Sequence, residues 1–169
     1  DDFVTIKDNW GRGIGLWGGS EGEFHDIRVE NNGQGDPNSS NPNMNDSVHV
    51  QWNASIKLLG GHIKQSGSNG LAVYNGSFAL VENGFVIENN GSDANGGSGI
   101  YARRGANLDV RDSFIRNNED HGLRISEAST ARLDDTEISG NGEHGINITE
   151  ASTLDAWDTT IKDNAKWGI

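Results

Sequence analysis

Apolar residues recur along this chain in short alternating runs, at positions that repeat with a period of 23. The segments from Gly122 to His144 and from Gly145 to Trp167 share this frame, with apolar residues at their second, fourth, tenth, twelfth and seventeenth positions. Alternation with a period of two is typical of half-buried strands. The pattern therefore predicts three short β-strands per unit, separated by turns rich in Gly, Asn and Asp.

The same frame extends over the whole chain. Units open at Gly13, Ser47, Gly70, Gly99, Gly122, Gly145 and Gly168. The spacings are 34, 23, 29, 23, 23 and 23, so the first and third units are longer than the period by 11 and by 6. These two insertions lie near 34–46 and 91–98. The unit from Gly70 also runs one position out of phase after its second strand, which predicts a bulge near Glu82 to Gly84.

One polar position supports stacked coils. Position twenty holds asparagine in most units, and the members of this column are Asn9, Asn32, Asn118, Asn141 and Asn164, with Ser66 as the exception. If successive units stack at the strand spacing of about 4.8 Å, these amides form a hydrogen-bonded ladder along one turn. Independent turns that merely favour asparagine would not keep this fixed register.

These repeats resemble those of the pectin-lyase-like superfamily. The resemblance rests on the Gly-Ile/Leu start, on the Asx turn before the third strand (Asp26, Asp112, Asp135, Asp158) and on the Asn-Xaa-Xaa-Xaa-Gly-Ile/Leu closure. It implies an all-β, right-handed single-stranded parallel β-helix of about six and a half coils over residues 1–169. We expect one domain, a segment of a longer solenoid, with end-to-end contacts to flanking domains or other chains. The superfamily is implied to include polysaccharide lyases, uronan epimerases, glycosidases, tailspikes and adhesins, so the fold does not choose a function.

The charge of the chain excludes some partners. Its 169 residues carry a formal net charge of −12 and no cysteine. Such an acidic chain is unsuited to nonspecific nucleic-acid binding, and no apolar run is long enough for insertion into a membrane. We expect a secreted or cell-surface protein.

The outward positions three, five and six form the candidate binding face, because packing occupies the inward ones. The two insertions should rise beside this face, and loops on a rigid scaffold often carry binding residues. Its expected substrate-binding residues are Trp17, Gln51, Trp52 and Arg104. Aromatic rings cover the apolar faces of sugars, and guanidinium groups bind carboxylate or sulfate. The face therefore predicts a polysaccharide partner, an acidic one in particular.

Catalysis on this face would follow the lyase or epimerase class. Proton abstraction beside a uronate carboxylate needs a base (His49 or Tyr74), a group that neutralises the carboxylate (Arg103 or Arg124) and an acid (Tyr101). No Asp-Pro-His motif and no aspartate cluster of polygalacturonases is present. The alternative is that these arginines are solvated surface charges paired with Asp109, Asp134 or Glu127.

We expect no cofactor, since the first insertion reads as an ordinary polar loop, with Ca²⁺ binding as the alternative. The insertion with Asp36, Asn38, Asn43, Asn45 and Asp46 offers oxygen ligands for Ca²⁺, but no EF-hand or nonapeptide motif occurs. His121 and His144 share a column and should stack, without forming a metal triad. Two classes of function remain: a carbohydrate-binding or carbohydrate-processing module, and a non-catalytic stalk, adhesin or tailspike module.

Overall fold

The computed structural model describes residues 3–34, 45–92 and 97–169, and all regular structure in these residues is β-strand. No helix in this part of the chain is long and apolar enough to cross a membrane. The strands, in order, are β1 (Thr5–Lys7), β2 (Ile14–Trp17), β3 (Glu21–Glu30), β4 (Val48–Gln51), β5 (Ser55–Lys64), β6 (Leu71–Tyr74), β7 (Phe78–Glu82), β8 (Phe85–Glu88), β9 (Ile100–Arg103), β10 (Asn107–Arg116), β11 (Leu123–Ser126), β12 (Thr130–Ser139), β13 (Ile146–Ile148), β14 (Thr153–Trp157) and β15 (Thr160–Lys162).

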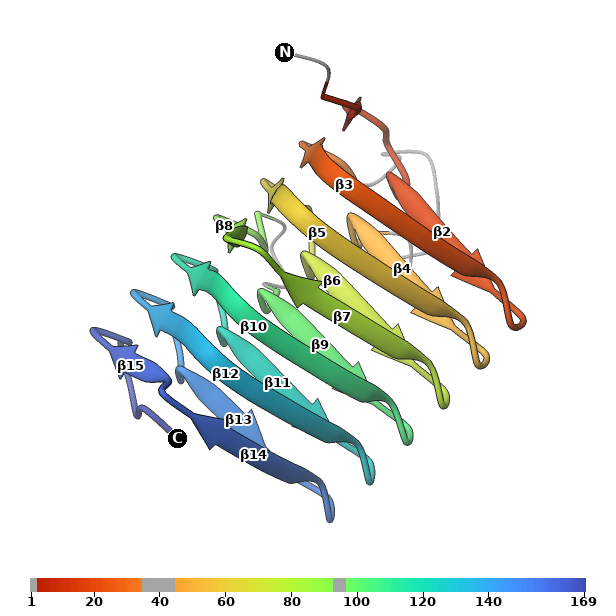
Figure 1. The fold of residues 1–169 in the computed structure, drawn as a ribbon. Helices are drawn as coiled ribbons and strands as arrows, with labels where there is room; N and C mark the ends of the chain where they lie inside the picture. The colour runs from red at the N-terminus through yellow and green to blue at the C-terminus, as the bar shows by residue number, and fades with distance from the viewer. Residues whose placement is uncertain (1–2, 35–44, 93–96) are drawn as a thin grey trace.

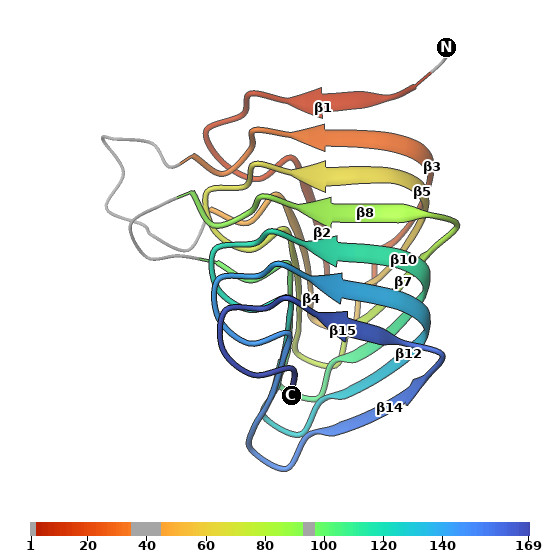
Figure 2. The same ribbon diagram turned by 90° about the vertical axis from the view of Figure 1, so that its left-hand side faces the viewer.

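These strands form two parallel sheets along one stack of coils (Figure 1). The smaller sheet has the order β13-β11-β9-β6-β4-β2, with one strand from each coil. The larger sheet has the order β1-β3-β5-β7-β10-β12-β14. Two further strands belong to it: β8 pairs with β5 and β10, and β15 pairs with β12. Figure 2 shows the coils one above another, from β1 near the N-terminus to β15 near the C-terminus.

The strand register follows the sequence repeat. Leu108 pairs with Ala131, and Ala131 pairs with Leu154, so each step across the sheet advances the chain by one unit. Ile14 pairs with Val48 across the first insertion, and Tyr74 pairs with Arg103 across the second, so both insertions leave the coil geometry intact. The insertions themselves fall largely on 35–44 and 93–96, outside the described residues.

The expected second and third strands of a unit run together as one long strand in β3, β5, β10 and β12. Each bends at the aspartate column or its glycine equivalent, where the backbone turns left-handed: φ is 49° at Asp26, 41° at Asp112 and 45° at Asp135. Aspartate tolerates this region better than most residues. The bulge near Glu82 to Gly84 is confirmed, because the pairing of β5 gains one position between Leu58↔Val81 and Ile63↔Ile87.

The core is a set of aliphatic columns between the sheets. The inward positions of the middle coils are fully buried, as for Val50, Leu58, Val73 and Ile87. Every coil contributes a few such side chains, and stacking brings equivalent ones into contact with each other. These aliphatic columns use the inward positions of the strands, which leaves the outward positions available for function.

The asparagine ladder is present and has one direction. The backbone N–H and the side-chain Nδ2 of Asn118 both donate to Oδ1 of Asn141, at 3.0 Å each. Asn141 donates in the same way to Asn164, at 3.0 and 2.8 Å. Asn90 joins the ladder through Asn118, since the bulge restores its register. The ladder thus satisfies buried polar groups in this turn of the coil.

Candidate functional site

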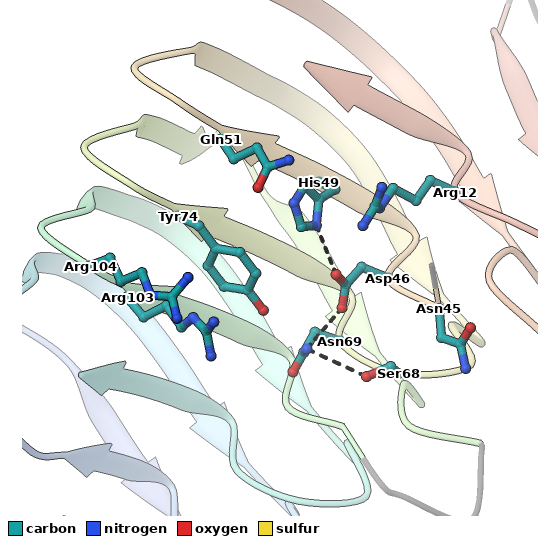
Figure 3. A pocket seen from close by; sticks show the side chains of 10 residues that line it. All are labelled: Arg12, Asn45, Asp46, His49, Gln51, Ser68, Asn69, Tyr74, Arg103 and Arg104. Atoms are coloured by element: carbon teal, nitrogen blue, oxygen red, sulfur yellow. Dashed lines mark hydrogen bonds and ion pairs between the residues drawn. The ribbon is translucent and has the colours of Figure 1, made fainter. Parts of the chain in front are cut away.

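A polar pocket of about 340 Å³ lies on the outer face of the smaller sheet, beside β4 and β6 (Figure 3). It is lined by Arg12, Asn45, Asp46, His49, Gln51, Ser68, Asn69, Tyr74, Arg103 and Arg104. Its volume is within the range of ligand-binding pockets. Residues from four successive coils build it, so the stacking of the solenoid positions the site.

Strand register explains how the aromatic side chains meet. One outward row runs His49–Ala72–Tyr101–Arg124 across β4, β6, β9 and β11. Ala72 is the small member of this row, yet it has no exposed surface. The ring of Tyr74, two positions further along β6, lies 5.0 Å from the ring of His49 and 5.5 Å from that of Tyr101, and so covers Ala72.

A chain of hydrogen bonds fixes the base of the pocket. The backbone N–H of Ser98 donates to Oδ1 of Asn69 at 3.0 Å, and Nδ2 of Asn69 donates to Oδ1 of Asp46 at 2.8 Å. The other carboxylate oxygen of Asp46 lies 2.9 Å from Nδ1 of His49. His49 and Asp46 are both buried, so this pair is held away from water. The Nε2 atom of His49 is also buried and has no hydrogen-bond partner.

The hydroxyl of Tyr74 stays protonated in this environment. Burial, together with the negative charge of Asp46, raises the pKa of the Tyr74 phenol far above its usual value. The hydroxyl therefore keeps its proton at neutral pH. It points into the same space as Asn69 and Arg103 (Figure 3).

Arginines stand on two sides of the pocket. Arg12 lies on one side, and Arg103 and Arg104 lie on the other (Figure 3). The guanidinium of Arg103 packs over Tyr74 at 4.8 Å from the ring centroid. Arg104 donates from Nε to Glu127 at 3.0 Å, which fixes its orientation. Three arginines thus meet at one pocket in a chain with a net charge of −12. Glu127, within 4.0 Å of both Arg103 and Arg104, and the buried Asp46 offset part of their charge.

The sequence matches a family model described as "Right handed beta helix region" over residues 46–169. The chain belongs to the right-handed β-helix family. This confirms the predicted fold and its hand, and β1 to β3 continue the same register before the matched segment. No curated protein sequence matches the chain. Family membership makes it a β-helix module of the carbohydrate-related or structural kind.

The β-helix brings only part of the expected site together. His49, Gln51, Tyr74, Arg103 and Arg104 line the pocket. Four expected residues lie outside the lining: Trp17, Trp52, Tyr101 and Arg124. Of these, the Trp17 ring lies 6.4 Å from that of His49, and Tyr101 and Arg124 continue the aromatic row into the next coils. Trp52 is 57 % exposed in a turn. The ring of Tyr74 fills the space between His49 and Tyr101.

The sequence did not indicate Asn45, Asp46 and Ser68 as residues of this pocket, and it also did not indicate Arg12 and Asn69. Both occupy the last position of a unit, directly before its opening glycine, as Asp46 does before Ser47. This column reads Arg12, Asp46, Asn69, Ser98, His121, His144 and Trp167. The place of this column beside the binding face could have indicated these residues, but the residue types in the column vary from coil to coil.

The calcium prediction falls mainly outside the described residues, which exclude Asp36, Asn38 and Asn43. Of the remaining candidates, Asp46 already uses both oxygens, one with Asn69 and one with His49. Within 3–34, 45–92 and 97–169, no group of three His, Asp or Glu side chains is arranged to hold a metal. Calcium binding stays an alternative to the ordinary polar loop.

The expected histidine stack is present in this β-helix. The rings of His121 and His144 are nearly parallel, with centroids 5.2 Å apart, and Trp167 follows at 5.1 Å from His144. Nδ1 of His121 accepts the backbone N–H of His144 at 3.3 Å. Burial, the neighbouring His144 and Arg124 lower the pKa of His121 to about 4. His121 is therefore neutral at pH 7.

Proposed function

We propose that the pocket binds an anionic sugar unit of an acidic polysaccharide. The observation that carries this proposal is the convergence of Arg12, Arg103 and Arg104 on one polar pocket in a strongly acidic chain. Guanidinium groups pair with carboxylate or sulfate, and the exposed ring of Trp17, beside the pocket, offers a face for the apolar side of a sugar. Secretion or cell-surface display fits such a partner.

The geometry favours binding over proton abstraction. A catalytic base has to lie within hydrogen-bond reach of the proton that it removes. Nε2 of His49 is covered by its surroundings, and Tyr74 retains its proton. These features suit a rigid recognition surface better than the lyase or epimerase reaction. In this site, the ring of His49 packs against Tyr74, and the ring of Tyr74 packs against the guanidinium of Arg103.

A structural role is the second candidate. It is favoured by the later coils, in which Arg111, Arg116 and Arg132 lie beside the carboxylates of Asp109, Glu88 and Asp134. Paired charges of this kind suit a solvated, rigid stalk. The two roles are compatible if the first coils bind and the later coils give length.

Calorimetry with oligosaccharides of uronic acids and with neutral oligosaccharides of the same length tests the proposal. We expect binding of the acidic series only, weakened by salt and by Arg103→Gln. Arg111→Gln, on the other sheet, is the matched control. Ultraviolet absorbance of an unsaturated product, or deuterium uptake in D₂O, would instead indicate the lyase or epimerase reaction. Absence of binding to every acidic polymer would leave the structural role.

A further inference from the structure

Arg124 is the exception among the arginines of the middle coils. Six arginines lie between positions 103 and 132. Five of them have a carboxylate oxygen within 4.0 Å: Arg103, Arg104, Arg111, Arg116 and Arg132. Arg124 has none among the residues that the structure describes. An acidic protein thus leaves one cation of its binding face without an ion pair.

This cation is held in place by an aromatic ring. The guanidinium of Arg124 lies 4.8 Å from the ring centroid of Tyr101, its cross-strand neighbour on β9. The hydroxyl of Tyr101 is in turn held by Oγ of the buried Ser126, at 3.3 Å. A stacked guanidinium loses less conformational freedom when it binds an anion than a free one does. Arg124 is therefore preorganised.

The hydrogen bonds of both neighbouring arginines are incomplete. The Nε atoms of Arg103 and Arg124 are buried, and neither has a hydrogen-bond partner. Both side chains are nevertheless partly exposed, so an anion would bind the other nitrogen atoms of each guanidinium group. Arg103 also lies 5.8 Å from the Tyr101 ring, so the two guanidinium groups flank the same tyrosine.

From this arrangement we infer that Arg103, Tyr101 and Arg124 form a second anion subsite, one coil beyond the pocket. The ligand is then an acidic oligosaccharide with at least two charged units, and it lies along the axis of the solenoid. The inference rests on the proposed function of the pocket and adds the minimum length and the direction of its ligand. A single uronate would occupy the pocket alone.

The test compares ligand lengths. Titration calorimetry with galacturonate and with its hexamer should give much tighter binding of the hexamer to the wild-type protein. Arg124→Gln should weaken hexamer binding by about tenfold or more, the effect of one lost charge-assisted hydrogen bond. Its affinity for the monomer should change less than about twofold, since Arg124 lies outside the pocket.

Arg132→Gln is the matched control. Arg132 also stacks on an aromatic ring, Trp157, at 4.8 Å, but it lies near Asp134 on the other sheet. The Arg132→Gln variant should bind both ligands as the wild type does. Thermal unfolding of Arg124→Gln and Arg132→Gln checks that the fold is kept. Equal hexamer affinity of Arg124→Gln and wild type would overturn the second subsite and leave the pocket standing. Failure of the wild type to bind galacturonate, its hexamer or any other acidic polymer would overturn the proposed function and the subsite together.

Discussion

The imidazole of His49 meets the ring of Tyr74 at 90°, with the two ring centroids 5.0 Å apart. This contact joins the buried polar chain of Asn69 and Asp46 to the aromatic and arginine residues of the binding face. Edge-to-face packing of this kind is directional. The orientation of Tyr74, and with it that of Arg103, therefore depends on residues deep in the turn before β4 and β6.

Enlarging Ala72 should displace Tyr74 from its place. Ala72 is fully buried on an outward row, under the tyrosine ring. Ala72→Leu has no room there, so we expect overpacking that costs about 1–3 kcal/mol of unfolding free energy. Affinity for acidic oligosaccharides should fall as well. Chemical denaturation and calorimetry measure the two effects. Asn147→Leu, in the same row beyond Arg124, is the control and should keep the affinity.

Asn69 should act on the site through Asp46. Asn69→Ala removes the donor to Asp46 and the acceptor for the Ser98 N–H, so we expect a loss of about 1–3 kcal/mol of stability. The NMR signals of the His49 ring should shift, and ligand affinity should fall.

His121→Ala provides the comparison for Asn69→Ala. His121 occupies the same column and also accepts the backbone N–H of the next coil, but it has no contact with Asp46. We expect His121→Ala to destabilise the protein and to leave the galacturonate affinity and the His49 signals unchanged, since His121 lies outside the pocket. If both variants weakened binding to the same extent, Asn69 would be a structural residue only.

The histidine stack should make stability depend on pH. The folded pKa of His121 is about 4, below its ordinary value of 6.5. The folded state therefore binds this proton less readily than the unfolded state. Its contribution is complete above pH 6.5 and is lost as the pH falls toward 4. Protonation also removes the acceptor at Nδ1 and places a cation against His144.

Thermal unfolding between pH 7.5 and 5 measures this effect. The midpoint of the wild-type protein should fall over this range, and that of His121→Asn should fall less. The window lies above the ordinary carboxyl pKa values, so the lowered pKa values of Glu137 and Glu143 contribute little within it. Identical pH profiles of the two proteins would show that the stack does not control stability.

Removal of one ladder member should be severe. Asn118→Ala deprives Asn90 of the acceptor for its backbone N–H and its side-chain amide, and both residues are buried. We expect a loss of about 2–4 kcal/mol, from two or more unmet buried polar groups. Asn147→Ala, in an outward row, should change stability by less than about 0.5 kcal/mol. Urea unfolding of the two variants measures whether the ladder contributes this much to the free energy of unfolding.

Features that recur in every coil were predictable from the sequence. Leu, Ile and Val at the inward positions and Asn at the turn keep one chemical type per column, so the period reveals both the strands and the ladder. The bulge was visible for the same reason, since it shifts the column by one position. Repetition alone could not show that two of the expected strands form one bent strand, because that depends on how sharply Asp112 and its equivalents turn.

The site was only partly predictable, because many of its residues depart from the sequence repeat. Arg12, Asp46 and Asn69 share a column but not a chemical type, so no period marks them. The covering of Ala72 by Tyr74 depends on a side-chain direction between neighbouring strands. The sequence likewise could not show whether Arg124 forms an ion pair, since acidic residues lie close to it along the chain.

The serine that interrupts the asparagine column has a mechanical consequence. Ser66 uses its hydroxyl for the backbone carbonyls of Asn45 and Asn69, and it has no amide oxygen to offer Asn32. The run of amides therefore breaks between Asn32 and Ser66, beside the longer insertion. At this joint the coils are held together by the nine paired positions of β3 and β5 and not by the amide ladder. Arg12 lies on one side of this joint and His49 on the other. A ligand bound in the pocket would therefore hold the two coils together.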